Sequence, residues 1–157
     1  TFFVPASWNV VGMTSDYEAW ILSVISKKSQ SIFEFGTCSG KTTFLFALNS
    51  PEDARVVTIT LDPGKAEEEI LDTGDNVFAK KNALSESIYN NFMFSLNSKL
   101  KEKIDVIFQD SKNLNIDKYK NSFDLIFIDG GHTYSCIKND TEKAMQMIKK
   151  KWFYFLA

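Results

Sequence analysis

Short apolar runs recur along the chain, each separated from the next by a stretch long enough for a helix. Four of them are rich in β-branched and aromatic residues and predict strands over 31–35, 55–61, 103–109 and 123–128. The run at 123–128, FDLIFI, is nearly continuous, as expected of a strand buried on both faces. A further aromatic run at 152–156 is a candidate fifth strand. These runs predict a sheet.

Amphipathic stretches predict the helices that connect these strands. A capping box opens a helix over 14–28, whose apolar residues we expect to pack against the sheet. Further helices are expected over 41–49 and around 137–148. Apolar residues recurring every four positions predict a long helix over 84–100, and 65–71 is a candidate short acidic helix.

Strands alternating with helices are typical of an α/β domain with a mostly parallel sheet and right-handed crossovers. The 157 residues suffice for a single domain, 1–157, with a substantial core. In such sheets, ligands bind at the carboxyl ends of the strands, where the strand order reverses. Glycine or polar residues follow the first four predicted strands, at 36–40, Asp62, 110–111 and 129–132. The sequence therefore predicts a ligand site at one end of the sheet.

Composition and charge narrow the range of partners. The net charge of −2 and the absence of an evident basic patch give no indication of nucleic-acid binding. No apolar run approaches the roughly 20 residues that a membrane-spanning helix needs. Cys38 and Cys136 have neither metal-site nor disulfide-rich spacing, which favours a reducing compartment and hence a cytoplasmic location. Homo-oligomerisation is an open expectation.

The stretch 31–43, SIFEFGTCSGKTT, predicts a strand, a glycine turn and a helix. Such a turn lets the backbone approach a ligand and points free helix N–H groups at it, although Gly36 and Gly40 also fit an ordinary turn. Glu34 lies within an apolar strand and needs a partner, because an unpaired buried carboxylate is costly. It either faces a cationic ligand or hydrogen-bonds the loop.

Two familiar nucleotide motifs fit this turn poorly. A phosphate-binding P-loop requires G-x-x-x-x-G-K-[ST], and the loop from Gly36 to Gly40 is one residue too short. The dinucleotide fingerprint G-x-G-x-x-G has Cys38 at its middle glycine and no third glycine nearby. An NTPase and an NAD-dependent enzyme are therefore the less favoured alternatives.

The other strand ends carry residues with two interpretations each. Asp62 lies 26 residues after Gly36, as an acid that binds ribose hydroxyls would, but it also fits an Asp-Pro-Gly turn. Asp110 either accepts from an adenine amino group or caps a loop. His132 is the only histidine and lies in a glycine-flanked loop, which favours a functional role over a hydrogen bond within the loop.

Four segments, taken in order, resemble the class I S-adenosylmethionine-dependent methyltransferases: 33–40, 61–63, 109–111 and 123–134. The last segment, FDLIFIDGGHTY, is similar to the branch whose fourth strand ends in Asp-Gly-x-His-x-Tyr, which includes many small-molecule and sugar O-methyltransferases. The resemblance implies a Rossmann-like, doubly wound sheet in the order 3-2-1-4-5 with helices on both faces. It also implies methyl transfer to a hydroxyl of a small molecule or sugar.

The resemblance further implies roles for single residues. The loop around the methionine part of the cofactor would comprise Glu34, Gly36, Thr37, Ser39 and Gly40. Asp62 would bind the ribose hydroxyls, and Asp110 and Ser111 would lie at the adenine. Asp129 and His132 would stand beside the sulfonium and the acceptor.

The chemistry of the reaction fits these roles. The sulfonium is already a strong methyl donor, so the protein mainly needs to position it. An alcohol acceptor must lose its proton, and His132 is a suitable general base because histidine side chains titrate near neutral pH. Asp129 is also a candidate ligand for a divalent cation such as Mg²⁺, which would lower the acceptor pKa. A hard cation needs about six oxygens, and no partners for Asp129 are evident.

Two features depart from the family pattern. Cys38 replaces the middle glycine of the first motif, and the last predicted helix runs directly into 152–157 without a glycine turn. The usual C-terminal antiparallel strands are therefore expected to be missing, in a truncated domain or one completed by a second subunit. Besides an active methyltransferase, the sequence allows an inactive cofactor- or nucleotide-binding domain of the same fold.

Overall fold

The computed structural model describes residues 14–64, 72–87 and 91–156. One five-stranded sheet forms the centre of the fold, in the order β3-β2-β1-β4-β5. Its strands are β1 Ser31–Phe35, β2 Arg55–Thr60, β3 Ile104–Phe108, β4 Phe123–Ile128 and β5 Ile148–Leu156. All four pairings are parallel. The predicted strand order is confirmed, and the fifth strand begins earlier than 152.

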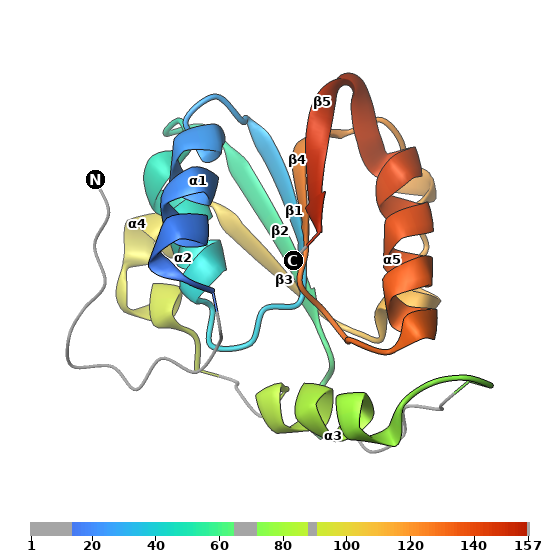
Figure 1. The fold of residues 1–157 in the computed structure, drawn as a ribbon. Coiled ribbons are helices and arrows are strands. Elements are labelled where there is room, and N and C mark those ends of the chain that lie inside the picture. The colour runs from blue at the N-terminus through green and yellow to red at the C-terminus, as the bar shows by residue number, and fades with distance from the viewer. Residues whose placement is uncertain (1–13, 65–71, 88–90, 157) are drawn as a thin grey trace.

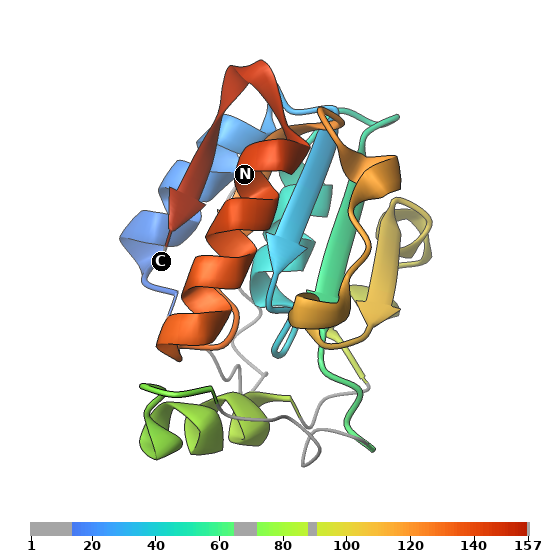
Figure 2. The same cartoon turned by 90° about the vertical axis from the view of Figure 1, so that its right-hand side faces the viewer.

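Helices cover both faces of this sheet, as predicted. They are α1 Asp16–Ser26, α2 Lys41–Asn49, α3 Val77–Glu86, α4 Ser98–Lys101 and α5 Tyr134–Met147, with 3₁₀ turns η2 Met93–Leu96, η3 Ser111–Asn113 and η4 Asp117–Tyr119. Figure 1 shows α1, α2 and α4 on one side of the sheet and α5 on the other. In Figure 2 the strand arrows point toward α3, which lies across the carboxyl end of the sheet. The predicted helix over 65–71 falls outside the described residues.

Two apolar clusters, one on each face, hold the layers together. Ile32 and Leu125 belong to the cluster under α1, α2 and α4. Phe33 and Ile126 belong to the cluster under α5. Successive residues of a strand point to opposite faces, so the continuous apolar runs of β1 and β4 supply both clusters. The two strands that carry the glycine turn and the Asp129 loop are thereby fixed at the centre of the core.

The prediction that the large apolar residues of α1 pack against the sheet holds only in part, since Ile25 packs against the cluster under α1. Tyr17, Trp20 and Val24 are exposed, and the buried face consists of small residues and one leucine: Ala19, Leu22, Ser23 and Ser26. This face lies against α2. The hydroxyls of Ser23 and Ser26 donate to main-chain carbonyls of α1 itself, so they are buried without an unpaired donor.

The predicted long helix over 84–100 is also wrong, because tertiary contacts override the four-residue period. α3 ends at Glu86, and η2 and α4 are separate short elements. Phe92 and Phe94 are buried against Gly40, whereas Leu96 of the same predicted stripe is 76% exposed. The side chain of Asn97 then caps α4 by accepting from its backbone.

Candidate functional site

A pocket opens where the first four strands end, underneath α3. Its lining comes from the ends of β1 to β4, from α3 and from the first half of α5: Phe35, Gly36, Thr37, Cys38, Ile59, Thr60, Leu61, Ala83, Glu86, Ser87, Gln109, Asp110, Ser111, Asp129, Gly130, Gly131, Cys136 and Asp140. This is the end of the sheet at which the sequence predicts a ligand. The pocket contains half of the ten predicted site residues, namely Gly36, Thr37, Asp110, Ser111 and Asp129.

Gly36 holds the loop after β1 against the loop after β4. Its φ is +96°, and a Cβ at this position would lie 2.0 Å from the carbonyl oxygen of Asp129. The backbone N–H of Asp129 in turn donates to the carbonyl of Phe35 at 2.9 Å. No other residue type fits here, because both the φ angle and the close backbone contact exclude a side chain.

Glu34 lies beneath the pocket and does not line it. Its side chain is 1% exposed, and its carboxyl accepts hydrogen bonds from the hydroxyls of Thr43 on α2 and Thr58 on β2. The Thr58 hydroxyl also lies 2.7 Å from that of Thr37 in the glycine loop. Burial raises the pKa of Glu34 to about 8. The predicted hydrogen bond to the loop is present only indirectly, through Thr58 and Thr37, and a contact of Glu34 with a cationic ligand stays a prediction.

The second half of the glycine turn faces away from the pocket. Gly40 begins α2 with a φ of +78°, and a Cβ there would lie 2.9 Å from atoms of Phe92 and Phe94. The carbonyl of Ser39 accepts from the N–H of Met93 at 3.0 Å. Ser39 and Gly40 therefore pack against the chain after α3. Both help to shape the turn, and their contact with a ligand stays a prediction.

Asp62 lies beside the pocket, next to the lining residue Leu61. Its Oδ1 accepts from the N–H of Gly64 at 3.0 Å, which is the turn contact that an Asp-Pro-Gly sequence favours. A carboxylate has a second oxygen with further accepting capacity. Turn formation and ligand binding are thus compatible at this residue.

The loop after β3 forms another wall of the pocket. Asp110 caps η3, with its Oδ1 accepting from the N–H of Lys112 at 2.8 Å, so the predicted loop-capping role is present. The ammonium group of Lys143, on α5, donates to the carbonyls of Ser111 and Lys112. Asp110 and Ser111 therefore stand on a turn that is fastened to α5.

Asp129 and His132 lie on the loop between β4 and α5. Asp129 lines the pocket, and burial raises the pKa of its carboxyl, while the nearby His132 opposes that shift. His132 itself is exposed and follows the lining residue Gly131. A carboxylate inside the pocket and an imidazole at its rim are thus close enough to interact electrostatically.

Two acidic pocket residues, Asp140 and Glu86, are absent from the sequence prediction. Asp140 is 1% exposed and lies on the buried stripe of α5, four residues from both Cys136 and Ala144. The sequence does show an acid among the apolar positions of this helix. That signal can be recognised only once the register of α5 is known, because the register decides which positions are buried. Glu86 ends α3, whose position the sequence pattern missed.

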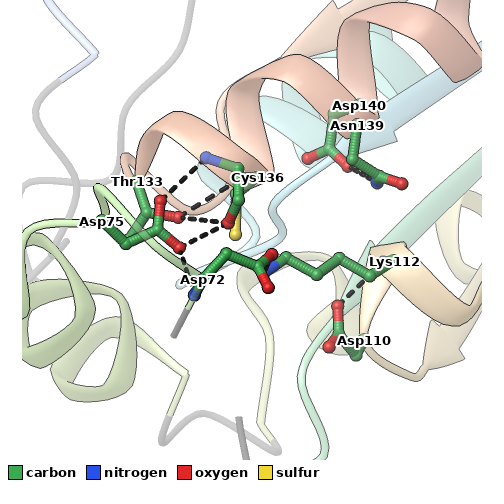
Figure 3. Close-up of polar contacts among 9 residues, drawn as sticks. Asp72, Asp75, Asp110, Lys112, Thr133, Cys136, Asn139 and Asp140 are labelled. Atoms are coloured by element: carbon green, nitrogen blue, oxygen red, sulfur yellow. Dashed lines mark hydrogen bonds and ion pairs between the residues drawn. The ribbon is translucent and has the colours of Figure 1, made fainter. Parts of the chain in front are cut away.

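Polar contacts connect the segment before α3 to two walls of the pocket. The carboxylate of Asp75 accepts from the backbone N–H of Ser135, in the first turn of α5, at 2.9 Å and also from the Ser135 hydroxyl. Asp72 accepts from the ammonium of Lys112 at 3.1 Å. Figure 3 shows Asp75 beside the first turn of α5, and the Lys112 side chain passing from the β3 loop toward Asp72. α3 is therefore tethered at its N-terminal side.

The described residues contain neither a metal-ligand cluster nor a membrane-spanning helix. Within residues 14–64, 72–87 and 91–156, no group of three or more His, Cys, Asp or Glu side chains is arranged to hold a metal ion. Over the same ranges, no helix has the length and apolar character needed to cross a membrane.

Sequence comparison identifies the family. Residues 33–154 match a family model described as a methyltransferase domain. The chain belongs to this family. The match contains most of β1, the glycine turn, the pocket loops and most of β5, so the pocket lies within the methyltransferase domain. No curated protein matches the sequence.

Solved methyltransferases share the fold of this domain. The O-methyltransferase TomG from Streptomyces achromogenes, in complex with SAM, has 17% identity and a TM-score of 0.57; 90% of this chain aligns with 55% of that protein. PaMTH1 from Podospora anserina, bound to SAH, has 16% identity and a TM-score of 0.60, with coverages of 92% and 53%. An O-methyltransferase from Bacillus cereus, in complex with SAH, has 20% identity and a TM-score of 0.55, with coverages of 86% and 53%. The chain thus spans little more than half the length of these proteins.

Proposed function

We propose that this methyltransferase domain binds S-adenosylmethionine in the pocket and transfers its methyl group to a hydroxyl of a small molecule or sugar. The observation that carries the proposal is the contact of Gly36 with Asp129, which brings the glycine turn and the Asp129 loop together at the reversal of strand order. The family match and the SAM- or SAH-bound proteins of the same fold support the choice of cofactor.

The residues present fit this cofactor chemically. Asp110 and Asp129 place carboxylates in the pocket, and Glu86, at the end of α3, raises the pKa of Asp129 further. Such groups favour a cationic ligand over an anionic one. Phe35, Ile59 and Leu61 give the same pocket apolar walls suited to a flat base. A nucleoside with a positively charged sulfonium combines both properties.

The predicted residues that line or adjoin the pocket then have tasks in the reaction. When bound, S-adenosylmethionine supplies an activated methyl group. The backbone around Gly36 and Thr37 lies against the amino-acid end of the cofactor, Asp62 accepts from the ribose hydroxyls, and Asp110 with Ser111 lies at the base. His132 accepts the proton of the acceptor hydroxyl on a ring nitrogen, and Asp129 stabilises the resulting imidazolium.

Calorimetric titration with S-adenosylmethionine, with NAD and ATP in parallel, tests the choice of cofactor. The domain should bind S-adenosylmethionine or S-adenosylhomocysteine and neither of the other nucleotides. The Lys41 ammonium, which a P-loop would direct at phosphate, instead donates to the carbonyl of Thr14 at 2.7 Å. Tighter binding of ATP or NAD would overturn the proposal.

His132→Ala tests methyl transfer, assayed against a panel of hydroxylated acceptors. Loss of a general base should lower turnover by about 10²- to 10⁴-fold and leave cofactor affinity within about threefold. An equal loss of turnover and affinity would contradict the role of His132 as base.

Asp62→Ala tests the ribose contact. We expect weaker cofactor binding, by about tenfold, since a ribose would lose a charged acceptor. Unchanged affinity would reduce Asp62 to a turn residue.

The proposal also includes a divalent cation, a cytoplasmic location and assembly with a second copy. A divalent cation at Asp129 remains a hypothesis; turnover measured with EDTA and with added Mg²⁺ checks it. A cytoplasmic location is supported by the sequence spacing of Cys38 and Cys136. Assembly with a second copy is checked by light scattering.

A further inference from the structure

Asp140 is an acid of the pocket to which the proposed reaction gives no task. It projects from the middle of α5, at a position where the helix otherwise buries Cys136, Ala144 and Met147. A charged side chain at such a position is costly unless it is paired. Its presence in the wall of the pocket therefore calls for a specific set of contacts.

The contacts of Asp140 join three parts of the site. Its Oδ1 accepts from the side-chain amide of Asn139 at 2.7 Å. Its Oδ2 lies 3.2 Å from where a Cβ on Gly130 would be, so it adjoins the loop after β4. The side chain of Ser111, on the loop after β3, forms a hydrogen bond that favours the ionised carboxyl. Figure 3 shows Asp140 and Asn139 on α5, on the side of the helix that faces the loop of Asp110 and Lys112.

Lys143, less than one turn further along α5, completes the attachment. Its ammonium donates to the carbonyls of Ser111 and Lys112, the latter at 2.8 Å. Its positive charge also favours the ionised form of Asp140. α5 therefore engages the turn after β3 through the side chain of Ser111 and through two main-chain carbonyls.

We propose that Asp140 is a positioning residue for the cofactor: with Lys143 it holds the turn of Asp110 and Ser111 in the geometry that binds the base. This inference rests on the proposed function, because it assigns the base of S-adenosylmethionine to that turn. It predicts an effect on cofactor affinity, and none on the methyl-transfer step itself.

The ionisation of Asp140 gives the proposal a distinctive signature. Burial raises the pKa of this carboxyl to about 6, opposed by Ser111, Asn139 and Lys143 and reinforced by Asp110. Asp140 is therefore mostly charged at pH 7.5 and mostly neutral at pH 5. The attachment of the turn, and with it the affinity for the cofactor, is stronger at the higher pH.

Calorimetric titration with S-adenosylhomocysteine at pH 7.5 and pH 5 tests this inference. At pH 7.5, Asp140→Asn should bind about tenfold more weakly than the unaltered protein, since a hydrogen bond to a charge is replaced by a neutral one. At pH 5 the two proteins should bind nearly equally, because residue 140 is then mostly uncharged in the unaltered protein and always uncharged in the variant. Glu142→Gln, on the exposed side of the same helix, is the matched control and should bind like the unaltered protein.

The outcomes separate the two proposals. Absence of S-adenosylhomocysteine binding by the folded, unaltered protein would overturn the proposed function itself. Binding with an Asp140→Asn effect that is absent, or equal at both pH values, would overturn only the positioning role. Should Asp140→Asn not fold, as judged by circular dichroism, Lys143→Gln provides the second variant: it releases the same turn and should weaken binding several-fold, and unchanged affinity would contradict the proposal.

Discussion

The floor and the roof of the pocket are built in different ways. The floor consists of the loops after β1 and β4. Both strands are buried except for the first residue of β1, and the two loops contact each other backbone to backbone at Gly36. The roof, α3, has Ala83 as its buried residue, with Val77 and Phe78 exposed, and polar side chains tether the segment before it. The floor is thus fixed by core packing, whereas the roof can yield without loss of the core.

Gly36→Ala should have the largest effect, because it places a methyl group inside the backbone contact of the floor. We expect a loss of stability of about 3 kcal/mol or more and no cofactor binding, measured by urea denaturation and titration. Gly74→Ala, in the turn before α3, is the matched control. Gly74 has a φ of +98° with nothing within 4 Å, so only the backbone strain of about 1 kcal/mol applies. Equal losses in the two variants would contradict the difference between floor and roof.

Glu34→Gln examines the buried support of the floor through the pH dependence of stability. The pKa of Glu34 rises from 4.5 to about 8 on folding, so the folded state binds this proton more tightly. The associated stability is complete below pH 4.5 and is lost as the pH rises toward 8. Between pH 5 and pH 8 the free energy of unfolding of the unaltered protein should fall by on the order of a few kcal/mol because of this group. The glutamine variant should lack that decline. Parallel stability curves for the two proteins, from urea denaturation across this range, would show that Glu34 does not cause it.

Asp75→Ala should loosen the roof and leave the floor intact. It removes the acceptor for the backbone and hydroxyl of Ser135. We expect limited proteolysis within 72–87 to accelerate several-fold, while the melting temperature changes little. Asp117→Ala, which removes an exposed ion pair with Lys120, is the control and should leave the cleavage rate unchanged. Unaltered cleavage of the Asp75 variant would mean that other contacts hold α3.

Cys38→Gly should give the smallest effect, a stabilisation of about 0.5 kcal/mol. Cys38 has a φ of +44°, which costs a cysteine more than a glycine, although the flexibility of glycine in the unfolded chain offsets part of the gain. Asn121, at +51°, is the comparison, since asparagine tolerates this conformation better and Asn121→Gly should gain less. Denaturant midpoints of the two variants show which gains more stability. A larger gain for Asn121→Gly than for Cys38→Gly would contradict the prediction.

The sequence predicts the floor better than the roof, for a physical reason. Strand β4 and helix α2 have the predicted bounds because they are encoded by continuous local patterns, FDLIFI and the stretch after Gly40. The strand order was implied instead by the resemblance to the methyltransferases, as was the ligand-binding role of the five predicted residues that line the pocket.

The predictions failed where distant contacts decide the structure. Burial of Phe92 and Phe94 against Gly40 breaks the helix expected over 84–100, and the start of α3 at Val77 lies outside that pattern. Asp140 was missed because its role depends on contacts with Ser111 and Gly130, which are distant in sequence. The capping roles of Asp62 and Asp110 are present in the structure, and their ligand contacts remain predictions.

The tether between Asp75 and Ser135 makes the first turn of α5 a built-in reporter of the roof. The amide proton of Ser135 is protected only while the carboxylate of Asp75 accepts it. Its exchange with deuterium, followed at this one amide, would therefore measure how often the roof lifts. Slower exchange in the presence of a ligand would indicate that the ligand holds the roof down, whatever the acceptor molecule is.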